Sequence, residues 1–285
     1  MRAKQLLLMT LSFLALSNAF AQADANSTSV SPAAASTVKK LVQGVNAADT
    51  GNSSTQQIEK TVHQYLMKKP EVVVEALQAY QQKQMESMQQ LFKDTQKMAP
   101  QYVDVLFHQN VDPMGGNAKG KITVVEFSDY QCSHCIETAA VIDSVVKTDP
   151  NLRVIVKEFP IRGPVSEAAA RAALAANKQG KYWEFRDALF KNGSALTEAK
   201  IYEIAKSIGL NVDQLKKDMN DAVIRQAVEA NQNLAKTLKL VGTPAFFIAK
   251  SDIKQGAPSA SINYIPGIVS QQQLQSIINQ LNNDK

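Results

Sequence analysis

The segment Ile122-Thr-Val-Val-Glu-Phe-Ser-Asp-Tyr-Gln-Cys-Ser-His-Cys135 decides how the chain folds. Its first part, Ile122 to Phe127, is an apolar and β-branched run, which predicts a buried strand. Two cysteines follow almost directly, and the sequence from Cys132 to about Lys147 predicts a helix. A further apolar run, Leu152 to Phe159, predicts a second strand. This order of strand, helix and strand predicts a right-handed crossover between two parallel strands.

The sequence after the second strand predicts a helical insertion followed by a return to the sheet. Residues from about 165 to 240 carry Ala-rich and amphipathic segments with no strand pattern. Breaks between the predicted helices fall near Gly180, Gly193, Gly209 and Asn220. Strands return at Ala245–Ala249 and around Ser261–Ile265, and Ser270 with Gln273 caps a final helix to about Asn282. The predicted fold class is therefore α/β, with a small mixed sheet and an inserted helical domain.

Two helices are predicted upstream of the sheet. A capping box at Ser54 and Gln57 begins the first, and the second runs from Pro70 to about Met98 without an internal Gly or Pro. The second helix carries a narrow apolar stripe, formed by Val74, Leu77, Met85, Met88 and Phe92. Such a stripe is too thin for a globular core but suits packing against another helix. We therefore predict a helical oligomerisation region over residues 55–100, and favour it over packing of this helix on the chain's own catalytic domain.

The segment between these helices and the first strand predicts a short strand and then turns. Tyr102 to His108 is the predicted strand, and Asp112 to Lys121 contains one proline and three glycines. Gly115 to Lys121 also fits the GxxxxGK half of a phosphate-binding loop. However, Ile122 stands where a Ser or Thr would hold magnesium, and the segment precedes a strand instead of joining a strand to a helix. We interpret it as a turn.

The N-terminal 21 residues predict a signal peptide. Met1 to Lys4 is basic, Leu6 to Leu16 is largely apolar, and Ala19-Phe20-Ala21 has the small-x-small form of a cleavage site. The apolar run is shorter than the ~20 residues that span a bilayer, so a cleaved signal is favoured over a membrane anchor. Residues 22–54, rich in Ala, Ser, Thr and Asn, predict a flexible lead. We therefore expect an exported protein in an oxidising compartment, and a bacterial periplasm fits best.

Composition narrows the classes of function. The 285 residues have a net charge of +5 and no basic run with interleaved aromatic residues, so no nucleic-acid partner is expected. Two cysteines are too few for a disulfide-rich scaffold, an iron–sulfur cluster or a four-thiolate zinc site. No bound cofactor is expected.

The tetrad Cys132-Ser133-His134-Cys135 is a CxxC motif at the start of a predicted helix. Unpaired backbone amides and the helix dipole favour a thiolate at Cys132, and a protonated His134 would add to this. A stabilised thiolate makes the corresponding disulfide a stronger oxidant. A structural staple gains little from closing so short a loop. A copper(I) or zinc site lacks a fourth ligand, because His63 and His108 lie in other segments. The redox pair is therefore favoured over both alternatives.

A second motif lies directly before the strand at Ala245. Gly242-Thr243-Pro244 places a proline at the entry to a predicted central strand, where its missing N–H is tolerated. We predict a cis Thr243–Pro244 bond that faces the CxxC motif, although a trans proline at a strand start is the more common arrangement. The exposed backbone of Thr243 would then pair with an extended substrate peptide.

Together these motifs resemble the DsbA-like thiol–disulfide oxidoreductases, which have a thioredoxin fold with an inserted helical domain. The resemblance extends from about Pro113 to Leu281 and rests on four segments: Glu126–Cys135, Glu158-Phe159-Pro160, Gly180–Phe185 and Val241–Phe246. It implies a catalytic domain over residues 101–285. It also implies that Cys132 is the nucleophile, Cys135 the resolving thiol, Pro244 the cis-proline, and Glu126 a buried acid that helps to move the proton of Cys135.

The resemblance further implies a function and its partners. Expected substrates are exported proteins with thiols or disulfides, and a membrane redox partner would recycle the enzyme. The N-terminal helices resemble the oligomerisation segments of exported relatives, and a homodimer is favoured over a trimer. Ser133 and Thr243 depart from the Pro and Val of the most familiar members. Because Thr at the second position resembles isomerases and reductases, we expect isomerase activity beside oxidation. The alternative function is a periplasmic copper(I)- or zinc-binding thiol protein.

Overall fold

The computed structural model describes residues 52–283 and divides the chain into two compact units, Met1–Ala79 and Tyr80–Lys285. The predicted signal peptide and nearly all of the predicted lead lie outside the described residues. Helix α2 (Asn52–Lys68) belongs to the first unit, and helix α3 (Glu71–Met98) crosses from the first unit into the second. None of the helices within residues 52–283 combines the length and the apolar character that crossing a bilayer requires.

The two predicted N-terminal helices are confirmed, and they are separated at Pro70. The N–H of Lys69 closes α2 by donating to the carbonyl of Tyr65, and the N–H of Val74 donates to the carbonyl of Pro70 at the start of α3. Apolar side chains of the first unit are largely exposed, namely Ile58, Val62, Tyr65, Met67, Val73, Val74 and Leu77. The first unit therefore has an apolar surface that it does not bury within itself.

The predicted strand over Tyr102–His108 is wrong, because this segment is helical. A 3₁₀ turn η1 (Ala99–Tyr102) leads into the short helix α4 (Val103–Phe107). Val103, Leu106 and Phe107 are buried while Asp104 is exposed, which is the spacing of one helical face and not the alternation of a strand. The β-branched and aromatic composition of the segment favours a strand, but the spacing of its apolar residues favours the helix that forms.

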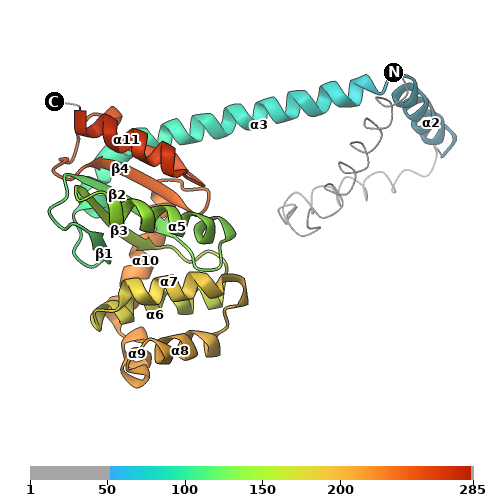
Figure 1. The fold of residues 1–285 in the computed structure, drawn as a ribbon. Coiled ribbons are helices and arrows are strands. Elements are labelled where there is room, and N and C mark those ends of the chain that lie inside the picture. Colours follow the sequence, from blue (N-terminus) through green and yellow to red (C-terminus); the bar gives the residue numbers. More distant parts are fainter. Residues whose placement is uncertain (1–51, 284–285) are drawn as a thin grey trace, which may run out of the picture. The chain divides into compact units, whose positions relative to one another are not determined.

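The sheet has five strands in the order β1-β3-β2-β4-β5, with β2 at its centre (Figure 1). The strands are β1 (Met114–Gly116), β2 (Ile122–Ser128), β3 (Leu152–Glu158), β4 (Ala245–Lys250) and β5 (Asn263–Pro266). Strand β2 pairs with β3 in parallel and with β4 in antiparallel orientation, and β5 pairs with β4 in antiparallel orientation. The predicted parallel β2–β3 pair is confirmed, as is the mixed sheet.

Strand β1 lies inside the segment whose sequence predicts only turns. It pairs antiparallel with β3, so that Met114 lies opposite Ile155. A Cβ atom on Gly115 would lie 2.1 Å from Cζ2 of Trp183. This glycine is therefore required for the close approach of the Trp183 ring to the edge of the sheet, and not for a turn.

Helices cover both faces of the sheet. Helices α5 (Ser133–Thr148) and α11 (Gln271–Asn283) pack on the face formed by alternate residues such as Val124, Val154 and Ile248. Helix α4 and the end of α10 (Ala222–Thr237) pack on the other face, against Val125 and Phe247. The capping bond from the N–H of Gln273 to Oγ of Ser270, 3.1 Å long, confirms the predicted start of the last helix.

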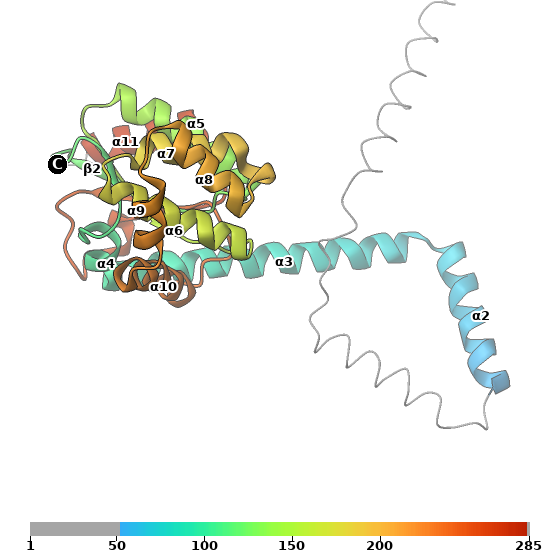
Figure 2. The same ribbon diagram turned by 90° about the horizontal axis from the view of Figure 1, so that it is seen from below.

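The insertion is helical from β3 to β4, as predicted. It consists of α6 (Pro164–Lys178), α7 (Tyr182–Asn192), the turn η2 (Gly193–Ala195), α8 (Glu198–Ser207), α9 (Val212–Met219) and α10. Figure 1 shows α6 to α9 below the sheet, and in Figure 2, which is seen from below, they lie in front of it. A further 3₁₀ turn, η3 (Ser259–Ser261), precedes β5. The helix ends at Lys178, Asn192, Ser207 and Met219 agree with the predicted breaks.

The last turns of α3 are part of the second unit. The hydroxyl of Thr95, which is fully buried, donates to the carbonyl of Leu238 over 2.9 Å. The Phe92 and Tyr264 rings meet edge to face, 6.1 Å between centroids. The α3 residues after Ala79 therefore help to hold the sheet and the insertion together.

Candidate active site

The two cysteines lie where the central strand leads into a helix. Strand β2 ends at Ser128, Cys132 is the N-cap of α5, and Cys135 lies in the first turn. Both cysteines are buried free thiols in this structure. The N–H of Ile136 donates to the carbonyl of Cys132 over 3.0 Å, so the first helical bond starts at the N-cap residue. The predicted position of the CxxC motif at a helix N-terminus is confirmed.

The Thr243–Pro244 peptide bond is cis, as predicted, and it faces Cys132. Strand β4 runs antiparallel beside β2 with Ala245 opposite Phe127, which brings the residues before β4 next to the residues after β2. The Cys132 thiol donates to the carbonyl of Thr243 over 3.2 Å. Oγ1 of Thr243 is buried and has no hydrogen-bond partner among the described residues. This hydroxyl can therefore turn toward the sulfur when Cys132 is ionised.

The two thiols have opposite acidities. A hydrogen bond from the Cys135 thiol lowers the pKa of Cys132 to about 4, helped by Thr243 and by the backbone N–H groups of Cys135 and His134. Burial opposes this shift without cancelling it. Burial raises the pKa of Cys135, and the neighbouring Cys132 raises it further. The reduced site therefore holds its single negative charge on Cys132 and its proton on Cys135.

His134 contributes to this arrangement through its backbone. Its N–H group stabilises the Cys132 thiolate, whereas its side chain is exposed to solvent at the start of α5. The helix N-terminus supplies this stabilisation whatever the charge on the ring.

Asp129 fixes the loop between β2 and the cysteines. Its buried carboxylate accepts four hydrogen bonds, from the N–H groups of Gln131, Ile161 and Arg162 and from the hydroxyl of Ser166. These bonds are 2.7 to 3.0 Å long. They tie the CxxC loop to the segment that enters α6, so the position of Cys132 depends on the insertion as well as on the sheet.

Glu126 is completely buried, as the family resemblance implies, but it is paired with a cation. Oε2 of Glu126 accepts from Nη2 of Arg186 over 2.9 Å, and both side chains are completely buried. Arg186 lies in α7 and also contacts Asp143 of α5 over 3.2 Å. The ion pair therefore joins the central strand to both of these helices.

Glu158, at the end of β3, is a second buried carboxyl group of this cluster. Its Oε1 accepts from the hydroxyls of Tyr130 and Tyr182, 2.8 and 2.7 Å away. Burial raises the pKa of Glu158 to about 8, although the hydrogen bonds from Tyr182 and Tyr130 favour the carboxylate. Glu158 lies opposite Ser128 in the sheet register, so it ends its strand beside the point where β2 gives way to the CxxC loop.

Sequence reasoning placed six residues in the site, namely Cys132, Cys135, His134, Thr243, Pro244 and Glu126. The structure brings Thr243 onto Cys132 directly, whereas the side chain of His134 is exposed. Sequence reasoning did not single out Asp129, Glu158 or Arg186. Asp129 and Glu158 stand in quoted motif segments, where a carboxylate beside an apolar run is the available signal. Arg186 follows the quoted Gly180–Phe185 segment and lies on the same helical face as Phe185 and Leu189, so its spacing is a local signal that it points into the core. Its partner Glu126 is distant in the sequence, and nothing local indicates that pairing.

The raised pKa of Glu158 predicts a stability that depends on pH. From its ordinary value of 4.5 up to about 8, Glu158 holds a proton in the folded chain that it releases in the unfolded chain, so the stability that this group contributes is fully present below pH 4.5 and is lost as pH rises toward 8. We expect Glu158→Gln to remove this decline. Relative to the parent chain, the variant should gain up to about 1.4 kcal/mol for each pH unit in this window.

Urea unfolding of both chains between pH 5 and pH 8 measures this difference. Glu137→Gln, which changes an exposed carboxyl group of α5, is the matched control and should not alter the slope. Parallel pH profiles for the parent chain and Glu158→Gln would contradict a protonated Glu158.

The described residues offer no set of ligands for metal binding, the alternative function. Among residues 52–283, no group of three or more His, Cys, Asp and Glu side chains is arranged to hold a metal ion. Cys132 and Cys135 therefore have no third described ligand of these types beside them.

Comparisons with known proteins agree with this geometry. Residues 123–279 match the DSBA-like thioredoxin domain, and residues 55–87 match the Copper resistance protein ScsC N-terminal domain. The crystal structure of BcfH from Salmonella enterica Typhimurium is 32% identical, covering 81% of this chain and 97% of that one, with a TM-score of 0.60. A thioredoxin-like oxidoreductase from Silicibacter pomeroyi DSS-3 is 35% identical, covering 64% and 98%, with a TM-score of 0.56.

Curated relatives include a larger protein. The Na(+)/H(+) antiporter NhaA 1 of Salinispora arenicola is 28% identical over 141 residues, which are 48% of this chain and 21% of the antiporter. The chain thus spans about a fifth of the length of this relative. The thioredoxin-domain match covers more than half of the chain, and it includes the CxxC loop, the insertion and the cis-proline strand. The chain therefore belongs to the DsbA-like thioredoxin family of thiol–disulfide oxidoreductases.

Proposed function

We propose that this chain is an exported enzyme that forms and isomerises disulfide bonds in other exported proteins. The observation that carries the proposal is the position of the Cys132–Cys135 pair at the start of α5, where the Cys132 thiol faces the carbonyl of Thr243 before the cis-proline. The lowered pKa of Cys132 and the raised pKa of Cys135 support it. The basic, apolar and small-x-small pattern of residues 1–21 supports export, and the periplasm is the compartment in which such an enzyme would act.

Oxidation of a client starts from the Cys132–Cys135 disulfide. A client thiolate attacks Sγ of Cys132, the bond between the two enzyme sulfurs breaks, and its electron pair goes to Cys135, which takes up a proton. A second client thiolate then attacks the client sulfur of the mixed disulfide and releases Cys132 as a thiolate. The client gains one disulfide and the enzyme gains two electrons. The low pKa of Cys132 favours this last step because it makes Cys132 a good leaving group.

Renewed oxidation of the enzyme needs an electron acceptor, and we propose a membrane redox partner for this step.

Isomerisation of a client disulfide starts from the reduced form of the Cys132–Cys135 pair. The Cys132 thiolate then attacks a wrong disulfide of the client, and the released client thiolate attacks elsewhere until Cys132 is displaced. Pairing of an extended client with the backbone of Thr243 would hold the client sulfur beside Cys132.

Isomerisation also needs a surface that holds a misfolded client, and we propose that self-association provides it. The exposed apolar side chains of α2 and the first part of α3 would pack against the same region of a second copy, in a dimer in preference to a trimer. Ile58 and Met67, for example, are 62% and 70% exposed in the isolated chain. Two active sites would then face one client.

A chain of residues 80–285 should separate the two activities. The cut at Ala79 keeps the bonds of Thr95 and Phe92 within the second unit, so the shortened chain should fold. We expect a monomer that oxidises a reduced dithiol peptide at the rate of the full chain, within about twofold, but loses most of its ability to reactivate scrambled ribonuclease. Light scattering, peptide oxidation and ribonuclease reactivation measure these three properties.

Two outcomes contradict the proposal in different ways. Absence of peptide oxidation by the full chain would remove the enzyme itself. Full reactivation of scrambled ribonuclease by a monomeric 80–285 chain would remove the role of self-association while leaving the thiol chemistry in place.

A further inference from the structure

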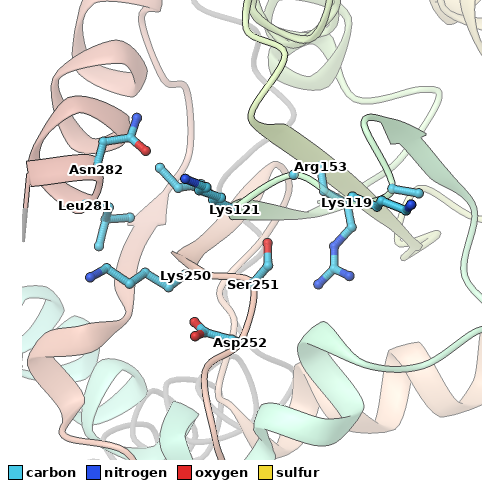
Figure 3. Close-up of a pocket in the computed structure, with 11 residues that line it drawn as sticks. Lys119, Lys121, Arg153, Lys250, Ser251, Asp252, Leu281 and Asn282 are labelled. Carbon is cyan, nitrogen blue, oxygen red and sulfur yellow. The ribbon is translucent and has the colours of Figure 1, made fainter. Parts of the chain in front are cut away.

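A positively charged cleft lies at the end of the sheet remote from the cysteines. It has a volume of about 550 Å³ and forms where β2 and β3 begin and β4 ends, beside the last turn of α11. Figure 3 shows its lining side chains, which include Lys119, Lys121, Arg153, Lys250, Ser251, Asp252 and Asn282. Because β2 runs from this cleft to the CxxC loop, its length places the two sites about 20 Å apart. A molecule in the cleft would therefore not touch the reacting sulfurs.

The described lining of the cleft is rich in cationic side chains. Among residues 52–283, it contains Lys119, Lys121, Arg153 and Lys250 and one carboxylate, that of Asp252. Within residues 52–283, no ion pair includes Lys119, Lys121 or Arg153. Cations that share a concave surface repel one another unless an anion lies between them.

Arg153 carries the strongest indication of an anionic ligand. Its guanidinium is partly buried and fixed by two bonds, from Nε to Oγ1 of Thr123 (2.8 Å) and from Nη2 to the carbonyl of Phe107 (3.2 Å). Both acceptors are uncharged, and Thr123 is in turn bonded to Ser251 over 2.7 Å. Neither acceptor neutralises the charge of the guanidinium, which is held in place at the wall of the cleft with N–H donors left for a ligand.

The loop that carries the two lysines is also fixed in advance. Asn117 donates from its side chain to the carbonyl of Pro150 over 2.7 Å and accepts from the N–H of Lys119 over 2.9 Å. The carbonyl of Lys121 accepts from the N–H of Ser251 over 2.8 Å, which joins the loop to the end of β4. Because the loop is already held by these hydrogen bonds, a ligand that binds to it causes little further loss of conformational entropy.

We propose that the cleft is a binding site for a phosphate ester with a small polar carrier. Several ammonium and guanidinium donors around one cleft suit a phosphate group, which offers more acceptor atoms and more charge than a carboxylate. The volume lies in the range of small-molecule sites. Among the described lining residues there is no aromatic side chain on which a nucleobase could stack.

The site differs from a nucleotide-binding loop even though Gly115 to Lys121 fits half of that motif. This segment leads into the strand β2 and not into a helix, so it lacks the helix N-terminus that holds the phosphate in a nucleotide-binding loop. Gly115 and Gly116 belong to β1, and the residues after them form the turn that supplies Lys119 and Lys121 to the cleft. The ligand would be held by side chains from three strand ends.

Titration of the ¹⁵N-labelled chain with glycerol 3-phosphate tests the proposal, with amide shifts of residues 118–121 and 251–252 as the readout. We expect saturable shifts, and an affinity that falls about tenfold or more in the Lys119→Gln/Lys121→Gln chain. The Lys206→Gln/Lys236→Gln chain, which loses the same charge from exposed positions of the insertion, should bind like the parent. Asp252→Asn should bind more tightly, because the one opposing carboxylate is gone.

Binding to vesicles distinguishes the source of the phosphate. The site is assigned to a lipid headgroup if the chain is retained on phosphatidylglycerol vesicles but not on phosphatidylcholine vesicles, and if the variants rank in affinity as they do for glycerol 3-phosphate. Binding of free glycerol 3-phosphate alone assigns it to a soluble ester. Three results would overturn the proposal: no saturable binding of either kind, an equal loss in both double variants, or weaker binding after Asp252→Asn.

Discussion

Replacing Cys132 by serine should abolish disulfide exchange completely, whereas replacing Cys135 by serine should trap clients as lasting mixed disulfides. In the first variant the remaining thiol is buried, and burial raises its pKa, so no thiolate is available at neutral pH. In the second variant Cys132 still attacks, but no neighbouring thiol can displace the client. Non-reducing electrophoresis after mixing with an oxidised client separates these outcomes.

The pH dependence of Cys132 tests the physical cause of this difference. With a pKa of about 4, most of Cys132 is thiolate at pH 5, roughly three orders of magnitude more than for an ordinary cysteine of pKa about 8.5. Alkylation by iodoacetamide should therefore be nearly constant from pH 6 to pH 8 and fall only near pH 4. Mass spectrometry of the modified chain identifies which sulfur has reacted.

A pair of variants isolates the hydrogen bond from residue 135. Cys135→Ser keeps a donor beside the Cys132 sulfur, whereas Cys135→Ala removes the group that contributes most to the low pKa. We expect the pKa of Cys132 to rise more in Cys135→Ala than in Cys135→Ser. Two results would contradict this account: a pKa of about 8.5 for Cys132 in the parent chain, as for an ordinary cysteine, or the same pKa of Cys132 in both variants.

The CxxC motif and the Thr243–Pro244 pair could be predicted from the sequence, because each is recognised from the residues next to it in the chain. The CxxC motif follows an apolar strand run, and the Thr243–Pro244 pair precedes another, so each motif indicates its own place at a strand end. Parallel pairing of β2 and β3 also follows from the order of elements along the chain. The site chemistry predicted at Cys132 needed only a helix N-terminus and a nearby proline.

The supporting residues could not be predicted in this way, because their roles depend on distant partners. Glu158 holds a proton only through burial beside Tyr130 and Tyr182, and the second tyrosine comes from the insertion. The cleft around Arg153 likewise combines a loop, two strand starts and a strand end. The wrong strand at Tyr102–His108 has a different origin, since its helical spacing was present in the sequence.

The Glu126–Arg186 ion pair carries the largest expected effect on stability. Both side chains are completely buried, and the guanidinium also lies 5.2 Å from the Trp183 ring centroid and 4.8 Å from that of Phe190. We expect Arg186→Met to lower the free energy of unfolding by about 3–5 kcal/mol, because it leaves the Glu126 carboxylate buried without its cation. Urea unfolding at pH 7 measures the loss. Arg162→Met, at an exposed position, should cost less than about 0.5 kcal/mol.

A second substitution shows whether the lost stability belongs to the ion pair or to packing. In the Glu126→Gln/Arg186→Met chain the orphaned charge is gone, so this chain should be more stable than Arg186→Met alone, although the substitution at Glu126 leaves a neutral amide at a buried position. The coupling energy from the double-mutant cycle should exceed about 1 kcal/mol, as expected for residues in direct contact. Simple additivity of the two single losses would mean that Arg186 stabilises the fold through its contacts with Trp183 and Phe190, and that Glu126 does not depend on its charge.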